Sequence, residues 1–166
     1  MQKLIGSILV ISACSAMGYW KCYDMKLHLE ELEELKKIFI MLQNELRYTK
    51  APFAEVFQRV GNKVNGTYKE WLLKFSERLK DRGNGTFYEL WKKSILDFLY
   101  ESMLSKEELE GLVEMGSNID CFETWGLYLE HLDNSIQSTR EEIMSKKKVY
   151  QSMGVMGGIF LVIILL

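Results

Sequence analysis

The 166-residue chain has few of the residues on which metal and redox sites depend. It contains three cysteines, two histidines and one proline. Cys14, Cys22 and Cys121 form neither a CxxC pair nor an even-numbered disulfide framework, which favours a reducing compartment. His28 and His131 each stand without another histidine or cysteine at ligand spacing. We therefore expect no metal and no cofactor.

Catalytic motifs are also lacking. The chain has no phosphate-binding glycine-rich loop, no HExxH pair and no serine in a Gly-x-Ser-x-Gly turn. Its many carboxylates stand beside lysines along helical segments, which is typical of a solvated surface. Outside the lysines near the C-terminus there is no clustered basic face, so nucleic-acid binding is not expected. The sequence predicts a protein that is not an enzyme.

Charge is missing from both ends of the chain. Residues 4–20, which end on Tyr19 and Trp20, have no charged side chain, and neither do residues 149–166. An eighteen-residue helix is about 27 Å long, against a hydrocarbon core of about 30 Å. We expect an N-terminal transmembrane anchor over residues 1–21 and a C-terminal transmembrane helix over residues 149–166. The second anchor contains three glycines that are candidates for packing against another span, namely Gly154, Gly157 and Gly158.

A cleaved signal is the alternative for the first apolar segment. The Ile-Ser-Ala-Cys sequence that ends at Cys14 resembles the cleavage box of a bacterial lipoprotein signal. Apolar character nevertheless continues past Cys14 to Trp20, where a cleaved signal would already have given way to a polar tether. An uncleaved anchor is the favoured interpretation, and a lipoprotein stays the alternative.

Basic residues beside the two apolar ends predict the orientation of the chain. Lysines follow the first segment and Arg140 precedes the second, whereas the outer flanks have only Lys3. By the positive-inside rule, residues 22–148 form a cytoplasmic domain. Three further lysines lie beside the second segment and would rest on the anionic headgroups of the lipid bilayer, namely Lys146, Lys147 and Lys148.

The region between the anchors predicts helices throughout. Apolar residues recur at steps of three and four over residues 29–47 and again over residues 120–150, so each of these ranges predicts a long amphipathic helix. We expect the two long helices to pair antiparallel, with shorter helices packed across them and Trp71, Trp91 and Trp125 in the core. The expected fold class is all-α, a cytoplasmic antiparallel bundle of about five to six helices flanked by an N-terminal and a C-terminal transmembrane helix.

Turn signals divide the middle of the chain into shorter helices. Pro52, the single proline, is expected in the first turn of a new helix, where its missing amide is no loss. Two Asn-Gly-Thr triplets follow, at residues 65–67 and 84–86. In each, Asn-Gly predicts a turn and Thr a helix N-cap, with a glutamate three residues later to close a capping box.

Two later helix starts have the same pattern. Ser105 with Glu108 predicts a capping box for a helix that ends near Met115, with Gly116 as its expected C-cap. Asp120 with Glu123 is expected to open the long final helix.

Four segments, in order, resemble the stage III sporulation protein AB family of endospore-forming bacteria. They are MQKLIGSILV, LQNELRYTKAPFAEVFQRV, LVEMGSNIDCFE and YQSMGVMGGIFLVIILL. The most specific part is Glu45-x-x-Tyr48 followed by Pro52, where the family has Glu-x-x-Tyr and then Thr-Pro-Leu. Asp120 stands where the family has a glycine, and Glu123 takes the place of its acid. The candidate interaction residues are Glu45, Tyr48, Pro52, Gly116, Asp120 and Glu123.

The resemblance implies a function and partners. The family is required for endospore formation, acts in the complex that links mother cell and forespore, and is similar in fold to platform proteins of type II secretion and type IV pilus machines. It implies a non-enzymatic scaffold in the mother-cell membrane facing the forespore. Its partners would be a sporulation ATPase of the same operon and other membrane subunits of the channel, and homo-oligomers are left open. One alternative is a membrane-tethered adaptor or sensor that binds a regulator or small ligand. Another is an enzyme, if Glu45 and Tyr48 line a cleft.

Overall fold

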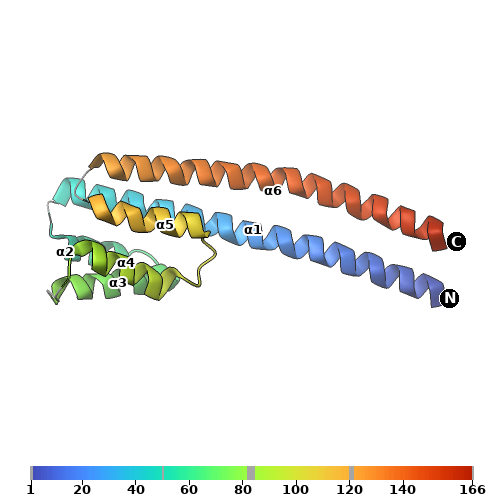
Figure 1. Cartoon of the computed structure of the whole chain (residues 1–166), viewed down its shortest axis with the longest axis horizontal. Helices are drawn as coiled ribbons and strands as arrows, with labels where there is room; N and C mark the ends of the chain where they lie inside the picture. The colour runs from blue at the N-terminus through green and yellow to red at the C-terminus, as the bar shows by residue number, and fades with distance from the viewer. Residues whose placement is uncertain (1, 50, 82–84, 120–121, 166) are drawn as a thin grey trace. The chain divides into compact units, whose positions relative to one another are not determined.

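Helices make up every regular element in the part of the chain that the computed structural model describes. The description covers the backbone of residues 2–49, 51–81, 85–119 and 122–165, and the side chains of residues 20, 23–49, 51–81, 85–119, 123–146, 149 and 156. The elements are α1 (Gln2–Thr49), α2 (Phe53–Gly61), α3 (Gly66–Lys80), α4 (Phe87–Leu99), α5 (Lys106–Met115), the 3₁₀ helix η1 (Gly116–Asn118) and α6 (Phe122–Leu165) (Figure 1). No strand occurs in these stretches, and the predicted all-α class is confirmed.

The chain divides into two compact units. Unit 1 consists of Met1–Glu30 and Ile136–Leu166, and unit 2 consists of Glu31–Ser135. Unit 2 therefore contains the last part of α1, all of the shorter helices and the first part of α6. Most of the described side chains belong to unit 2.

The described residues include no helix with the combination of length and apolar character that a membrane crossing requires.

Nearly all side chains of the two expected anchors, residues 1–21 and 149–166, lie outside the described residues. Three side chains within these ranges, those of Trp20, Val149 and Met156, are described and are exposed. The anchors therefore stay a prediction from the sequence.

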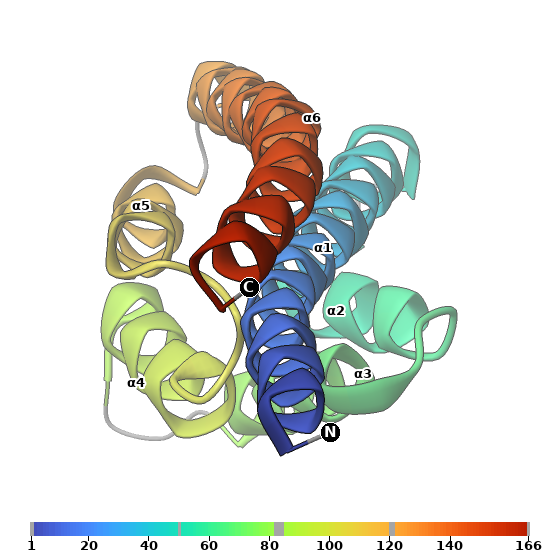
Figure 2. The ribbon, with the colours of Figure 1, turned by 90° about the vertical axis from the view of Figure 1, so that its right-hand side faces the viewer.

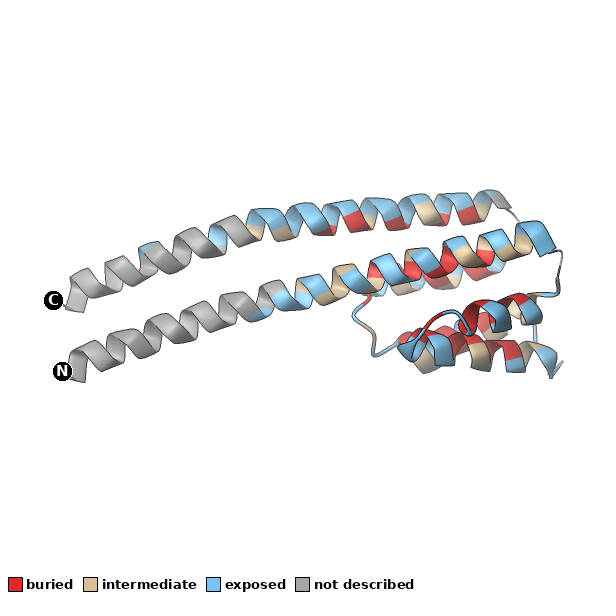
Figure 3. Ribbon diagram, turned by 180° about the vertical axis from the view of Figure 1, so that it is seen from behind, coloured by how far each residue is buried: buried red, intermediate tan, exposed pale blue. Residues whose placement is uncertain are grey.

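Unit 2 has an aromatic core, as predicted. The side chains of Trp71, Trp91 and Trp125 are almost completely buried. The Trp91 ring lies at the centre of this core and contacts the rings of Phe39, Phe57, Trp71, Phe75 and Phe87. Each buried aromatic side chain removes about 150–250 Å² from water, which makes such residues the main source of stability in a small core. Figure 3 shows buried positions alternating with exposed ones along each helix of this unit, as amphipathic helices require.

Within unit 2, α1 and α6 pack side by side in opposite directions. The Phe39 ring lies 4.9 Å from the Tyr128 ring and 5.7 Å from the Trp125 ring, measured between centroids. Lys36 forms an ion pair with Asp133. The earlier residue of α1 thus meets the later residue of α6, which confirms the predicted antiparallel pair. The shorter helices pack in chain order, with α2 against α3, α3 against α4 and α4 against α5 (Figure 2).

Two of the three threonine and serine capping boxes are confirmed. At the start of α4 the Thr86 hydroxyl accepts a hydrogen bond from the Glu89 amide at 3.3 Å, and the Glu89 carboxylate accepts one from the Thr86 amide at 2.9 Å. Ser105 and Glu108 make the same reciprocal pair at the start of α5, with distances of 3.2 and 2.7 Å. These bonds satisfy amides that have no partner inside the helix.

The capping box predicted at Thr67 is wrong. Helix α3 begins one residue earlier, at Gly66, and its N-cap is Asn65 without a side-chain bond. Gly66 has a φ of 63°, a left-handed conformation that glycine adopts without steric cost. Because glycine permits this geometry, the helix starts before the threonine. Pro52 is likewise one residue outside the first turn, at the N-cap of α2.

Candidate functional site

Three of the six candidate interaction residues lie where α1 is followed by α2. Glu45 and Tyr48 lie on the last turns of α1, and Pro52 is the N-cap of α2 with a φ of −58°. The Pro52 carbonyl accepts the first hydrogen bonds of α2. The Thr49 hydroxyl donates a hydrogen bond to the Glu45 carbonyl at 2.6 Å, which satisfies a carbonyl near the end of α1. We call residues 45–63 the α1–α2 corner.

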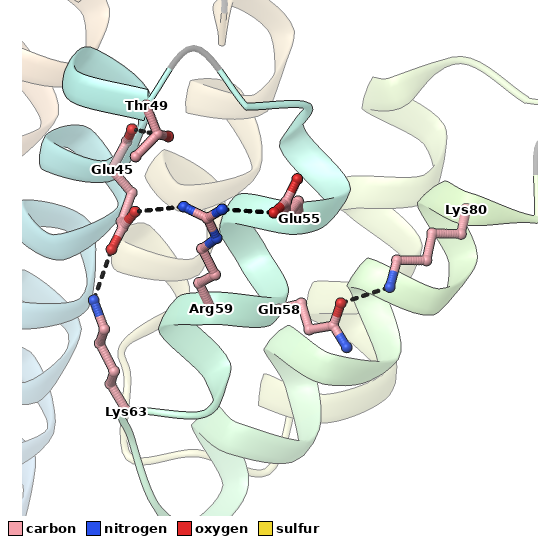
Figure 4. Close-up of polar contacts among 7 residues, drawn as sticks. All are labelled: Glu45, Thr49, Glu55, Gln58, Arg59, Lys63 and Lys80. Carbon is pink, nitrogen blue, oxygen red and sulfur yellow. Dashed lines mark hydrogen bonds and ion pairs between the residues drawn. The ribbon is translucent and has the colours of Figure 1, made fainter.

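Glu45 lies at the centre of a charged network in this corner (Figure 4). Its carboxylate accepts a hydrogen bond from Nζ of Lys63 at 2.7 Å, and its second oxygen lies 3.6 Å from Nη1 of Arg59. Arg59 also donates from Nη2 to the Glu55 carboxylate at 2.6 Å. The Glu45 side chain is only 17% exposed. The network therefore joins α1 to α2 and balances two carboxylates with two cations.

The cations lower the pKa of Glu45. The hydrogen bond from Lys63 is the largest cause, and the positive charges of Lys63 and Arg59 lower the pKa further. Desolvation of the carboxylate acts in the opposite direction and raises it. The pKa of Arg59 is raised, chiefly by its hydrogen bond to Glu55. Both groups stay ionised near neutral pH. Their arrangement fixes the position of α2 and does not suit proton transfer, which needs a pKa near the working pH.

Tyr48 extends into solvent from the same corner. Its side chain is 77% exposed, and Pro52 is exposed as well. An exposed aromatic side chain adds nothing to the core, but tyrosine is among the residues most enriched at binding hot spots. The corner presents an aromatic side chain on a fixed helical frame.

Gly116 belongs to the core of unit 2. It is buried at the C-cap of α5, as predicted, but with a right-handed φ of −65°. A Cβ atom at this position would lie 2.0 Å from Cδ1 of Trp91. Nε1 of Trp91 donates a hydrogen bond to the Leu112 carbonyl at 2.8 Å, so the ring is held in place. The structure thus gives Gly116 a packing role.

The first turn of α6 lies at the same end of unit 2 as the α1–α2 corner (Figure 1). Glu123 is exposed in this turn. Asp120 lies outside the described residues. Of the predicted membrane-proximal lysines, Lys146 forms an ion pair with Glu142 four residues earlier in α6. The remaining predicted site residues have side chains outside the described residues, namely Lys147, Lys148, Gly154, Gly157 and Gly158.

Arg59 and Lys63 were not predicted as site residues from the sequence. Their spacing of four places them on one face of α2 and its extension, which is a detectable signal of a basic face. Their partner is on another helix, however, and helical spacing carries no information about contacts between helices. Within the described residues, no group of three or more histidine, cysteine, aspartate or glutamate side chains is arranged to hold a metal ion.

Comparison with known proteins identifies a family. No curated protein and no solved structure matches the chain. The sequence model of stage III sporulation protein AB matches residues 3–166, which is nearly the entire length. The chain therefore belongs to the stage III sporulation protein AB family, and this membership implies a role in sporulation.

Proposed function

We propose that this protein is a non-enzymatic membrane platform that docks a cytoplasmic sporulation ATPase of the same operon through the α1–α2 corner. Family membership supports the sporulation role. The observation that carries the docking proposal is Tyr48, a large aromatic side chain that is 77% exposed beside a network that holds its helix in place.

The corner has the physical properties of a binding hot spot. Hot spots combine an aromatic anchor with surroundings that stay fixed on binding, because ordering a flexible surface reduces affinity. The Lys63 hydrogen bond to Glu45 fixes α2 against α1 before any partner arrives. A partner then buries Tyr48 and Pro52 with little further loss of conformational freedom. Glu45 is already paired with Lys63 and Arg59. Binding of the partner therefore depends mainly on the aromatic and apolar surface of the corner.

Membrane anchoring is the second part of the proposal. It rests on the uncharged residues 4–20 and 149–166 and on the basic residues next to them. In this arrangement the domain over residues 22–148 lies in the cytoplasm of the mother cell, at the membrane that faces the forespore. The anchors would contact the lipid bilayer and other membrane subunits of the channel.

The docking proposal is tested by Tyr48→Ala in the full-length protein. We expect a large loss of heat-resistant spores and of ATPase co-purification from sporulating cells, with the thermal unfolding of the protein unchanged, because the exposed side chain does not stabilise the fold. Tyr23→Ala is the matched control, since it truncates another exposed tyrosine of α1 that lies outside the corner. Normal spore counts and normal ATPase capture by the Tyr48→Ala protein would exclude the corner as the docking site.

A further inference from the structure

The exposed side of α4 carries apolar side chains next to two lysines. Leu96 is 51% exposed and Tyr100, at the C-cap, is 73% exposed. Lys92 and Lys93 precede Leu96 by four and three residues and are also exposed, so the four side chains share one face of the helix. Neither lysine forms an ion pair with any residue that the structure describes. We call Lys92, Lys93, Leu96 and Tyr100 the α4 strip.

The neighbouring helix α5 carries the opposite charge. Glu107, Glu110 and Glu114 are exposed and recur at steps of three and four, so they form a single acidic face, which we call the α5 strip. A weak contact of 3.8 Å joins Glu110 to Lys106, which is itself highly exposed. Helices α4 and α5 pack against each other. Unit 2 thus has a helix with exposed lysines and apolar side chains packed against a helix with exposed glutamates.

Trp91 sets the register between the two helices. Near the start of α4, its Nε1 donates to the Leu112 carbonyl and its ring lies against Gly116, both at the end of α5. The two helices are therefore antiparallel. The lysines of the α4 strip directly follow Trp91, so along the helix axis they lie level with Glu114. The apolar end of the α4 strip lies level with the first turns of α5.

We propose that this face binds the same face of a second copy of the chain. A two-fold axis parallel to α4 and α5 places the α4 strip of each copy on the α5 strip of the other, so every contact is made twice. Residues at the same position along the helix axis then face each other across the interface. Lys92 and Lys93 of one copy lie opposite Glu114 of the other. A different partner would need acidic side chains opposite the α4 strip and basic side chains opposite the α5 strip. A second copy already has both, and for this reason we commit to it.

The size of the face predicts weak self-association. Helix α4 has 13 residues and α5 has 10, which at about 1.5 Å per residue gives lengths of roughly 20 and 15 Å. Two helices of this length form an interface at or below the low end of stable complexes, about 1,200 Å² in total. We expect a reversible dimer whose population rises with protein concentration. The inference uses a different surface from the α1–α2 corner and does not depend on ATPase docking.

Charge reversal tests the proposal with the full-length chain in detergent. Lys92→Glu with Lys93→Glu reverses the charge of the α4 strip, and Glu110→Lys with Glu114→Lys reverses two of the three charges of the α5 strip. Each double variant alone should self-associate at least about tenfold more weakly than the natural chain, because like charges then face each other. An equimolar mixture of the two should regain association, because an acidic face meets a basic face in both halves. Sedimentation velocity with one variant fluorescently labelled measures both effects.

A reversal elsewhere on the surface is the control. Lys69→Glu with Lys74→Glu on α3 should leave self-association unchanged. A natural chain that is monomeric at every concentration overturns the proposal, as does a mixture of the two reversed variants that stays monomeric. Binding of a different channel protein that is lost with Lys92→Glu and Lys93→Glu, by a chain that never dimerises, also overturns it and assigns the α4 strip to that protein.

Discussion

The indole ring of Trp91 lies so close to Gly116 that a Cβ atom at Gly116 would be 2.0 Å from Cδ1 and 2.6 Å from Nε1 of the ring. The ring is fixed on its other sides by the aromatic core of unit 2 and by its hydrogen bond to the Leu112 carbonyl. This contact joins the end of α5 to the centre of the core. It also determines the register of α4 and α5, from which the proposed dimer follows.

Gly116→Ala should strongly destabilise unit 2. The added methyl group cannot fit unless Trp91 moves, and such a movement disturbs the core and weakens the hydrogen bond to Leu112. Overpacking of a dense core costs about 1–3 kcal/mol, and a weakened hydrogen bond adds about 1 kcal/mol. We expect the free energy of unfolding to fall by about 2–4 kcal/mol, measured by urea denaturation of the full-length protein in detergent.

Gly126→Ala is the matched control for this change. A Cβ atom at Gly126, on the exposed side of α6, would meet no atom within 4 Å. Alanine is favoured over glycine inside a helix by about 1 kcal/mol, so this variant should be slightly more stable than the natural protein. Equal effects of the two substitutions would contradict the contact between Gly116 and Trp91.

Tyr128→Phe should stabilise the protein. The Tyr128 hydroxyl is buried and has no hydrogen-bond partner among the described residues. An unpaired buried hydroxyl costs about 1–3 kcal/mol, and removing it recovers part of this penalty. We expect a gain of about 0.5–1.5 kcal/mol in the free energy of unfolding. Tyr68→Phe is the comparison, because the Tyr68 hydroxyl donates to Glu31 at 3.3 Å and its removal should give no gain.

Burial of the same two tyrosines predicts a loss of stability at high pH. Loss of solvent raises the pKa of both Tyr68 and Tyr128 far above the ordinary value of about 10. The folded state therefore keeps these protons when the unfolded state releases them, and the free energy of unfolding falls as the pH rises above about 10. Replacing both tyrosines with phenylalanine should remove most of this dependence. An unchanged alkaline slope in urea denaturation would contradict the prediction.

Glu45→Gln should change how the free energy of unfolding depends on pH in the acidic range. The pKa of Glu45 is lowered in the folded protein, so its contribution to stability is complete above the unfolded pKa of about 4.3 and is lost as the pH falls through the lower folded value. The natural protein should be slightly more stable than the variant at pH 7, and this difference should disappear in acid, as followed by urea denaturation. Glu34→Gln, on the exposed side of α1, is the control and should have little effect at pH 7.

Thr86→Ala and Thr67→Ala should differ in effect although both triplets read Asn-Gly-Thr. Thr86 accepts a hydrogen bond from the Glu89 amide, so its loss should cost about 1 kcal/mol. Thr67 lies inside the first turn of α3, where no side-chain cap bond is present, and its replacement should cost much less. Urea denaturation of the two variants distinguishes a true N-cap from a similar sequence.

Helix positions and their apolar faces could be predicted from the sequence because they depend on residues three or four apart. The same holds for the capping boxes at Thr86 and Ser105, whose partners are three residues away. The box predicted at Thr67 is wrong because one glycine with positive φ changed the first residue of the helix. The first residue of such a helix depends on how the preceding loop packs against the neighbouring helices.

The sequence by itself determined the helical class, the uncharged ends and the family, since each rests on local pattern or on the order of segments. Only the tertiary structure decided what the candidate residues do. It paired Glu45 with Lys63, 18 residues away, left Tyr48 exposed, and buried Gly116 against Trp91. These contacts join residues on different helices. Helical spacing decides which way a side chain points from its own helix, and the packing of the helices decides what it meets.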